Sequence, residues 1–180
     1  MNSKVTHINV GNLAENCWFL ANEDTKEAVV IDPGAEPDRI CAAAEKHGWK
    51  ITAILLTHGH IDHMGACESL RTELGVKVYA LTEEEDLLLD AKKNLSVFIE
   101  RKVVTFEPDE LLRDGQELTL AGMKIQVIHT PGHTPGGCSY YVAEAGCVFS
   151  GDTLFAESVG RSDFPGGSTS ALVRAVKEKL

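Results

Sequence analysis

The stretch Thr57-His58-Gly59-His60-Ile61-Asp62-His63 decides how the rest of the sequence is interpreted. It places three imidazoles and one carboxylate within six residues, and so holds three of the chain's 7 histidines. The stretch begins at the last residue of a continuous apolar run, 51–57, and such a run is typical of a strand covered on both faces. Histidines at i and i+2 on an extended loop point to the same side, and imidazole and carboxylate groups are ligands for zinc, iron or manganese. The stretch therefore predicts a metal site rather than a polar surface loop.

Two more candidate ligands follow β-rich runs. His133 lies in a turn rich in Gly and Pro after the run 124–130, and Asp152 follows the run 147–151. Loops at the carboxyl ends of strands meet at one edge of a layered sheet, so we expect both groups to join the histidine stretch. The isolated histidines, His7, His47 and His129, are expected to be structural or exposed.

Strand-like and helix-like segments make up one α/β unit over residues 1–180. Helices are expected from Glu36 to the Gly48 stop, over 64–74 and from Thr82, and a helical apolar stripe runs from Leu172 to Leu180. Strands are expected over 5–10, 16–21, 28–32, 51–57, 76–81, 103–106, 117–120, 124–128, 138–142 and 147–150. Strand clusters on either side of helical segments favour stacked layers, with sheets inside and helices outside.

Composition narrows the range of partners. The 180 residues carry a formal charge of −10, so the field of the molecule repels phosphate backbones and anionic membranes. For this reason neither nucleic acid nor a membrane is expected as a partner. A spanning helix is not expected either, because the longest apolar run, 17–21, is far shorter than the roughly 20 residues that such a helix needs. The start of the chain lacks the apolar region of an export signal, and the 5 cysteines form no CxxC pair. Reduced, mostly buried thiols and a cytoplasmic location are therefore expected.

Three motifs together resemble the metallo-β-lactamase superfamily in order and context. They are the stretch Thr57 to His63, Thr130-Pro-Gly-His133 with Thr134-Pro-Gly-Gly137, and Ser150-Gly-Asp152-Thr-Leu-Phe155. The resemblance implies a four-layer αββα sandwich. Gly151 to Phe155 and the segment Gly160-Arg-Ser-Asp-Phe-Pro-Gly-Gly167 look most like short glyoxalase II-type proteins, the hydroxyacylglutathione hydrolases.

The same resemblance implies a set of metal ligands. One metal would be held by His58, His60 and His133, and a second by Asp62, His63 and a further histidine, with Asp152 as a bridge. Two cations about 3.5–4 Å apart can share a hydroxide, which Asp62 would orient or deprotonate. Zinc is favoured, as one or two ions, with iron or manganese as alternatives.

The sequence departs from the family pattern at its end. No histidine follows Asp152, and the apolar stripe of the last helix stops on Leu180 without a cap. We therefore expect a chain cut inside its last βα unit, with a second metal position that is weak or empty.

The resemblance implies hydrolysis of acyl-thiol thioesters of the S-lactoylglutathione kind by a metal-bound hydroxide. Arg161 would then bind an anionic part of the substrate, and Asp32 would support the ligands or form a turn. Two alternatives are an iron-dependent persulfide dioxygenase using His58, His133 and Asp152, and a catalytically inert, truncated metal-binding scaffold. A β-lactamase is not expected without an export signal. The acyl group, the thiol carrier and the oligomeric state stay open.

Metal analysis tests the expected order of filling. Protein purified without chelator should hold one tightly bound equivalent per chain, because only the three-histidine position has its full set of protein ligands. Two tightly held equivalents would contradict this.

Overall fold

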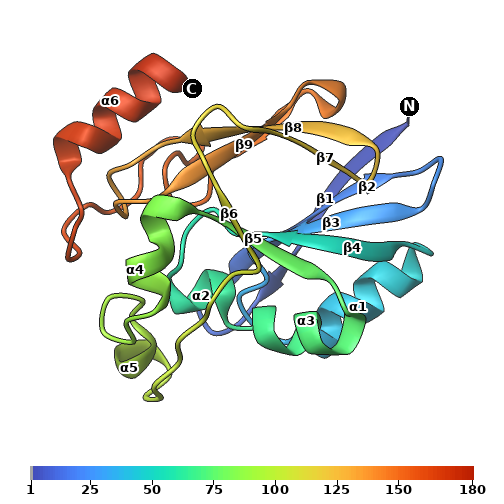
Figure 1. Cartoon of the computed structure of the whole chain (residues 1–180), viewed down its shortest axis with the longest axis horizontal. Helices are drawn as coiled ribbons and strands as arrows, with labels where there is room; N and C mark the ends of the chain where they lie inside the picture. The colour runs from blue at the N-terminus through green and yellow to red at the C-terminus, as the bar shows by residue number, and fades with distance from the viewer. Residues whose placement is uncertain (1) are drawn as a thin grey trace.

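Two β-sheets pack face to face in the computed structural model, which describes residues 2–180 (Figure 1). The first sheet has the order β1-β2-β3-β4-β5-β6, with antiparallel pairing from β1 to β3 and parallel pairing from β3 to β6. Its strands are β1 (Ser3–Val10), β2 (Glu15–Asn22), β3 (Glu27–Ile31), β4 (Lys50–Leu55), β5 (Lys77–Leu81) and β6 (Glu110–Leu112). The second sheet is antiparallel in the order β10-β9-β8-β7, with β7 (Glu117–Leu120), β8 (Met123–His129), β9 (Cys138–Val142) and β10 (Cys147–Phe149).

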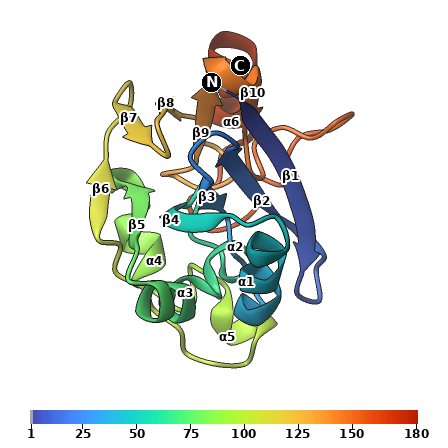
Figure 2. The same cartoon turned by 90° about the vertical axis from the view of Figure 1, so that its right-hand side faces the viewer.

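Helices cover the outer faces of this sandwich. The helices α1 (Pro37–Lys46) and α3 (Cys67–Leu74) lie against the first sheet, and α6 (Thr169–Lys179) lies on the side of the second sheet (Figure 2). Short helical turns occupy the connections: α2 (Ile61–Met64), η1 (Thr82–Glu84), α4 (Glu85–Leu88), α5 (Ser96–Ile99) and η2 (Ala143–Ala145). The predicted four-layer αββα order is confirmed. No helix among residues 2–180 is long and apolar enough to cross a membrane.

The strand β4 shows why the run 51–57 is apolar throughout. Ile54 belongs to the core beneath the helices, together with Ile40 and Leu70. Its neighbour Leu55 belongs to the core between the sheets, together with Tyr140. Each such buried side chain contributes on the order of 1.5–3 kcal/mol. The strand is therefore fixed from both faces, and the histidine stretch begins at its end.

Several predicted elements are wrong in detail. Residues 103–106 form no strand, and the edge of the first sheet is β6 instead. The helix expected over 64–74 is broken because the Ala66 amide donates to the Pro33 carbonyl, outside the helix. The helix expected from Thr82 is instead the 3-10 turn Thr82–Glu84 followed by a short helix, Glu85–Leu88, and the Thr82 hydroxyl donates to the Leu112 carbonyl.

The last helix follows its predicted stripe only in part. Leu172 is buried and Val176 is half-buried, but Leu180 is 40% exposed and does not face the core. The stripe drifts off the sheet within the last turn, because side chains at strict i+4 spacing rotate slowly around a helix of 3.6 residues per turn.

Tyr140 ties the two sheets together close to the histidine stretch. Its buried hydroxyl donates to the Leu56 carbonyl over 2.6 Å. Replacing Tyr140 with Phe should lower the free energy of unfolding by about 1 kcal/mol, because a buried carbonyl loses its hydroxyl donor. Denaturant unfolding measures this, with Tyr141→Phe as the matched control since Tyr141 is 42% exposed on the same strand. Equal stability of the two variants would contradict the prediction.

Candidate metal centre

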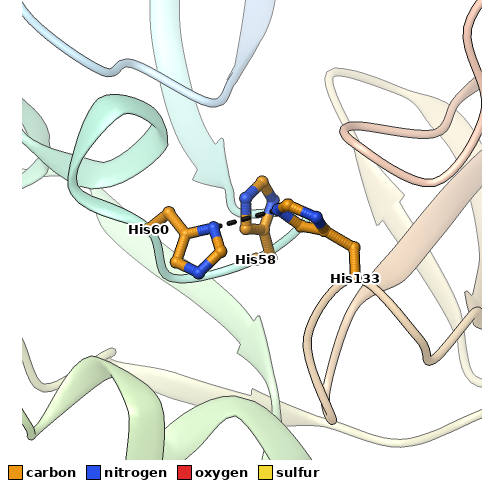
Figure 3. Close-up of side chains that lie close together, drawn as sticks. All are labelled: His58, His60 and His133. Carbon is orange, nitrogen blue, oxygen red and sulfur yellow. Dashed lines mark hydrogen bonds between the residues drawn. The ribbon is translucent and has the colours of Figure 1, made fainter. Parts of the chain in front are cut away.

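Three histidines from two loops converge where the two sheets meet. His58 and His60 lie in the loop after β4, and His133 lies in the loop between β8 and β9 (Figure 3). Each offers a ring nitrogen, and these nitrogens all lie within 4.8 Å of one another. Nδ1 of His60 is 3.0 Å from Nε2 of His133. The loops predicted to meet therefore do meet.

The environment keeps these imidazoles neutral. All three side chains are buried. Burial, followed by the neighbouring imidazoles, lowers the pKa of His58 well below its usual range and that of His60 to about 3. Burial also lowers the pKa of His133, although Asp152 opposes it. Neutral imidazole is the form that binds a metal.

The free lone pairs fit a cation. Within the described chain, Nε2 of His58 is buried and has no hydrogen-bond partner. The close approach of His60 to His133 likewise brings two ring nitrogens together with no group between them. Orphaned buried polar atoms are costly, and a shared divalent cation would satisfy them. Histidine and aspartate residues thus form a metal-binding site.

Hydrogen bonds fix how the rings are turned. Nδ1 of His133 donates to the Arg161 carbonyl over 2.7 Å, which leaves Nε2 as the ligand atom. Nδ1 of His58 lies 3.1 Å from the Thr57 hydroxyl, which donates to Asp32 over 2.5 Å. These two hydrogen bonds leave Nε2 of His58 free. Metal-ligating histidines typically donate a hydrogen bond from their other ring nitrogen in this way.

Asp32 supports the histidine stretch, which is one of the two roles that the sequence left open. Its backbone is left-handed (φ 54°), which costs a residue other than glycine on the order of 1–3 kcal/mol. Its buried carboxylate accepts the Thr57 amide over 2.7 Å as well as the Thr57 hydroxyl. It also lies 3.0 Å from Nδ1 of His63. One strained residue thus orients both ends of the histidine stretch.

His63, Asp62 and Asp152 lie beside the three histidines. Nε2 of His63 is 3.4 Å from Asp152 and 3.7 Å from Asp62. The other oxygen of Asp152 is 3.5 Å from Nε2 of His133, so this carboxylate lies between the two predicted metal positions. Burial works against the charge on His63, but Asp32 and Asp152 outweigh it and raise the pKa of His63 well above its usual range. Their roles as ligands and bridge stay predictions.

Close packing brings Asp152 into place. Gly151 has a left-handed backbone (φ 48°), and a Cβ there would lie 2.2 Å from the Thr57 hydroxyl. A side chain at this position would push Asp152 away from the histidines. This explains the glycine that precedes the carboxylate in the sequence.

Two neighbours of the centre are not predicted from the sequence. The Glu15 side chain is only 8% exposed, with Oε1 3.7 Å from Nδ1 of His63 and Oε2 without a partner in the described chain. Burial raises the pKa of Glu15 to about 9. The ring of Phe164 stands 5.1 Å from that of His60 and 5.6 Å from that of His133. Glu15 is a single acidic residue just before a predicted strand, so no local pattern identifies it. Phe164 lies in the segment 160–167 that resembles glyoxalase II-type proteins, but nothing in that segment predicts its contact with the histidines.

A cavity of about 560 Å³ opens beside His63. Its polar side is formed by Glu15, Asp32, Asp62 and Asp152, and Trp18, Phe149 and Phe155 are among its apolar residues. Among the described residues that line it there is no lysine or arginine. The cavity therefore has room for a small molecule, and most of its charged lining residues are acidic.

Arg161 approaches the centre through its backbone. Its carbonyl accepts from His133, while its guanidinium pairs with both oxygens of Asp163 at 2.9 and 2.8 Å. The guanidinium also lies 4.6 Å from the centre of the Phe164 ring and is largely exposed. A role for this side chain in substrate binding stays a prediction.

The five cysteines are free thiols. Cys17, Cys67 and Cys138 are buried, and Cys41 and Cys147 are partly buried. None belongs to either group of candidate metal ligands in the described chain. The expectation of buried side chains is confirmed for the first three.

The geometry of the centre agrees with a family match. Residues 10–180 match the model of the metallo-β-lactamase superfamily. The chain belongs to this superfamily. Its αββα sandwich agrees with this membership.

Members of the superfamily include similar proteins of known sequence. A probable metallo-hydrolase, YqgX of Bacillus subtilis, is 38% identical over 172 residues, which is 95% of this chain and 81% of that protein. The hydroxyacylglutathione hydrolase GloC of Haemophilus influenzae is 34% identical over 168 residues, 92% of this chain and 79% of that protein.

Solved structures of the superfamily are similar as well. The B3 metallo-β-lactamase BLEG-1 superposes with a TM-score of 0.92 at 36% identity, over 98% of this chain and 85% of that one. TTHA1623, crystallised in a di-iron-bound form, gives a TM-score of 0.83 at 36% identity, over 96% and 84%.

Asp32 offers a test of how the rings are oriented. Asp32→Asn should weaken zinc binding roughly 10- to 100-fold, since an amide cannot accept from both Thr57 and His63 as the carboxylate does. Competition with a chromophoric chelator measures the affinity. Asp24→Asn, at an exposed turn, is the control. An affinity for the Asp32 variant equal to that of the control would show that the carboxylate does not support the ligands.

Proposed function

We propose that the chain is a metal-dependent hydrolase of acyl-thiol thioesters, of the S-lactoylglutathione kind. The observation that carries this is the set of three neutral, buried imidazoles, with the Asp62 and Asp152 carboxylates on the side of the cavity. The relative GloC, named as a hydroxyacylglutathione hydrolase, supports the substrate class. A metal-dependent hydrolase is also what the similarity to YqgX favours.

The bound metal would polarise the thioester carbonyl and provide a hydroxide nucleophile at neutral pH. His58, His60 and His133 would hold one ion, and Asp62, His63 and Asp152 would take part in holding a second. Zinc is our first choice for this donor set. Iron is the main alternative, supported by the di-iron form of TTHA1623, and manganese is a further one.

Side chains of the protein would transfer the proton, exclude water and bind the substrate. Asp62 is 23% exposed toward the cavity and would accept the proton of the nucleophile. The apolar side of the cavity, with Trp18 and Phe155, would exclude water around the acyl-thiol. Arg161 would bind an anionic end of the thiol only if its guanidinium exchanged Asp163 for the substrate carboxylate.

Partners and setting follow from the same proposal. We expect a small-molecule substrate, with neither nucleic acid nor membrane as a partner, because the chain carries a formal charge of −10. Free thiols at all five cysteines fit a reducing, cytoplasmic setting.

A persulfide dioxygenase is the second candidate. Asp152 lies 3.5 Å from His133, so two histidines and one carboxylate are available for an iron site with open positions. This reaction would consume oxygen, whereas thioester hydrolysis would not.

The substrate panel that tests the proposal compares S-lactoylglutathione, glutathione persulfide with oxygen, and a chromogenic cephalosporin. We expect hydrolysis of the thioester, and a fall in kcat of roughly 100-fold or more for Asp62→Asn because the proton acceptor is lost. The exposed variant Asp24→Asn is the control. Oxygen uptake would replace the proposal by the dioxygenase, and cephalosporin cleavage would replace it by a β-lactamase. No turnover with metal bound would replace it by the inert scaffold.

A further inference from the structure

We infer that Glu84 is a positioning residue that holds the two histidine-bearing loops at the spacing needed for metal binding. The inference rests on the metal binding of the proposed function and is independent of the substrate. Glu84 lies in the turn η1 directly after β5, outside the three motifs that define the centre.

The side chain of Glu84 connects the two loops directly. It is 1% exposed. Oε1 accepts the Gly59 amide over 2.8 Å, and Oε2 accepts the Gly136 amide over 2.8 Å. Gly59 is the residue between His58 and His60, and Gly136 follows His133 by three residues. One carboxylate therefore holds a backbone amide from each half of the three-histidine set.

This connection matters because the two loops belong to different sheets. The loop with His58 and His60 follows β4 of the first sheet, and the loop with His133 joins β8 to β9 of the second sheet. A second connection runs from the Cys138 amide to the Thr57 carbonyl over 2.9 Å. His58 is thus flanked by two hydrogen bonds that fix its backbone relative to the opposite loop, one of them through Glu84.

Both glycines are needed for the carboxylate to reach the backbone. A Cβ on Gly136 would lie 2.2 Å from the backbone nitrogen of Glu84. A Cβ on Gly59 would lie 2.6 Å from the Leu88 side chain, which follows Glu84 in the next turn. These contacts leave no room for a side chain, so the loops close on Glu84 at backbone distance.

The ionised carboxyl group costs stability here. Burial raises the pKa of Glu84 to about 7, although the Gly59 and Gly136 amides lower it. A carboxyl pKa above its unfolded value means that the folded chain binds the proton more tightly, so stability falls as pH rises from about 4.5 to 7. In the ionised form both oxygens are acceptors only, which matches the two amides that they face. A buried carboxylate that lowers stability at neutral pH would be retained if its two hydrogen bonds keep the histidine-bearing loops in place.

The experiment compares Glu84→Gln with Glu83→Gln, a change of the same chemistry at an exposed neighbour. Glutamine keeps one acceptor oxygen but turns an NH₂ group toward the other amide, so one loop is released. We expect the zinc affinity of the tightest site to fall roughly tenfold or more, and the absorption spectrum of the cobalt-substituted protein to change. The unfolding midpoint of the metal-free protein reports separately on any purely structural effect.

Two results would overturn the inference. One is a zinc affinity within twofold of wild type with an unchanged cobalt spectrum. The other is a loss of affinity matched by an equal loss of metal-free stability. If Glu84→Gln does not fold, Glu84→Asp replaces it, since the shorter carboxylate can reach only one loop, and the same fall in affinity is expected. Failure of both variants to fold would assign Glu84 a structural role only.

These outcomes separate the inference from the proposed function. Wild-type protein that binds zinc tightly but turns over no thioester removes the proposed substrate and leaves Glu84 untouched. A Glu84 variant with normal zinc affinity removes the inference and leaves the hydrolase proposal intact.

Discussion

The metal centre depends on the packing of one sheet against the other. His58 and His60 come from the first sheet, and His133 comes from the second. Neither sheet alone carries the three-histidine set. The core between the sheets, which includes Leu55 and Tyr140, therefore sets the spacing of the ligands as well as the stability of the fold. Interiors of this kind are close-packed, so a small shift between the layers would be felt directly at the ring nitrogens.

This dependence explains which features could be predicted from the sequence. The stretch Thr57 to His63 carries its own signal, because four potential ligands in six residues have few other uses. The strands β2, β4, β8 and β9 were also predicted, within one or two residues at their ends, since their apolar patterns reflect burial on defined faces. The meeting of His133 and Asp152 with this stretch followed from their places at strand ends.

Features that depend on distant partners could not be predicted in this way. Glu84 stood in an acidic run that resembled the first turn of a helix, yet it is buried and binds two loops. Residues 103–106 are as β-like as a true strand but pair with no sheet. In each case the deciding interaction is with residues that local sequence does not reveal.

Groups that cost stability cluster around the histidines. Asp32 has a left-handed backbone, and burial raises the pKa of both Glu15 and Glu84. Such groups reduce the stability of the metal-free protein, although hydrogen bonds offset part of the cost at Asp32 and Glu84. A metal that binds only the folded chain would offset it, by an amount that grows with the ratio of free metal to its dissociation constant. Backbone strain and buried carboxyl groups are therefore concentrated at the place where a metal would bind.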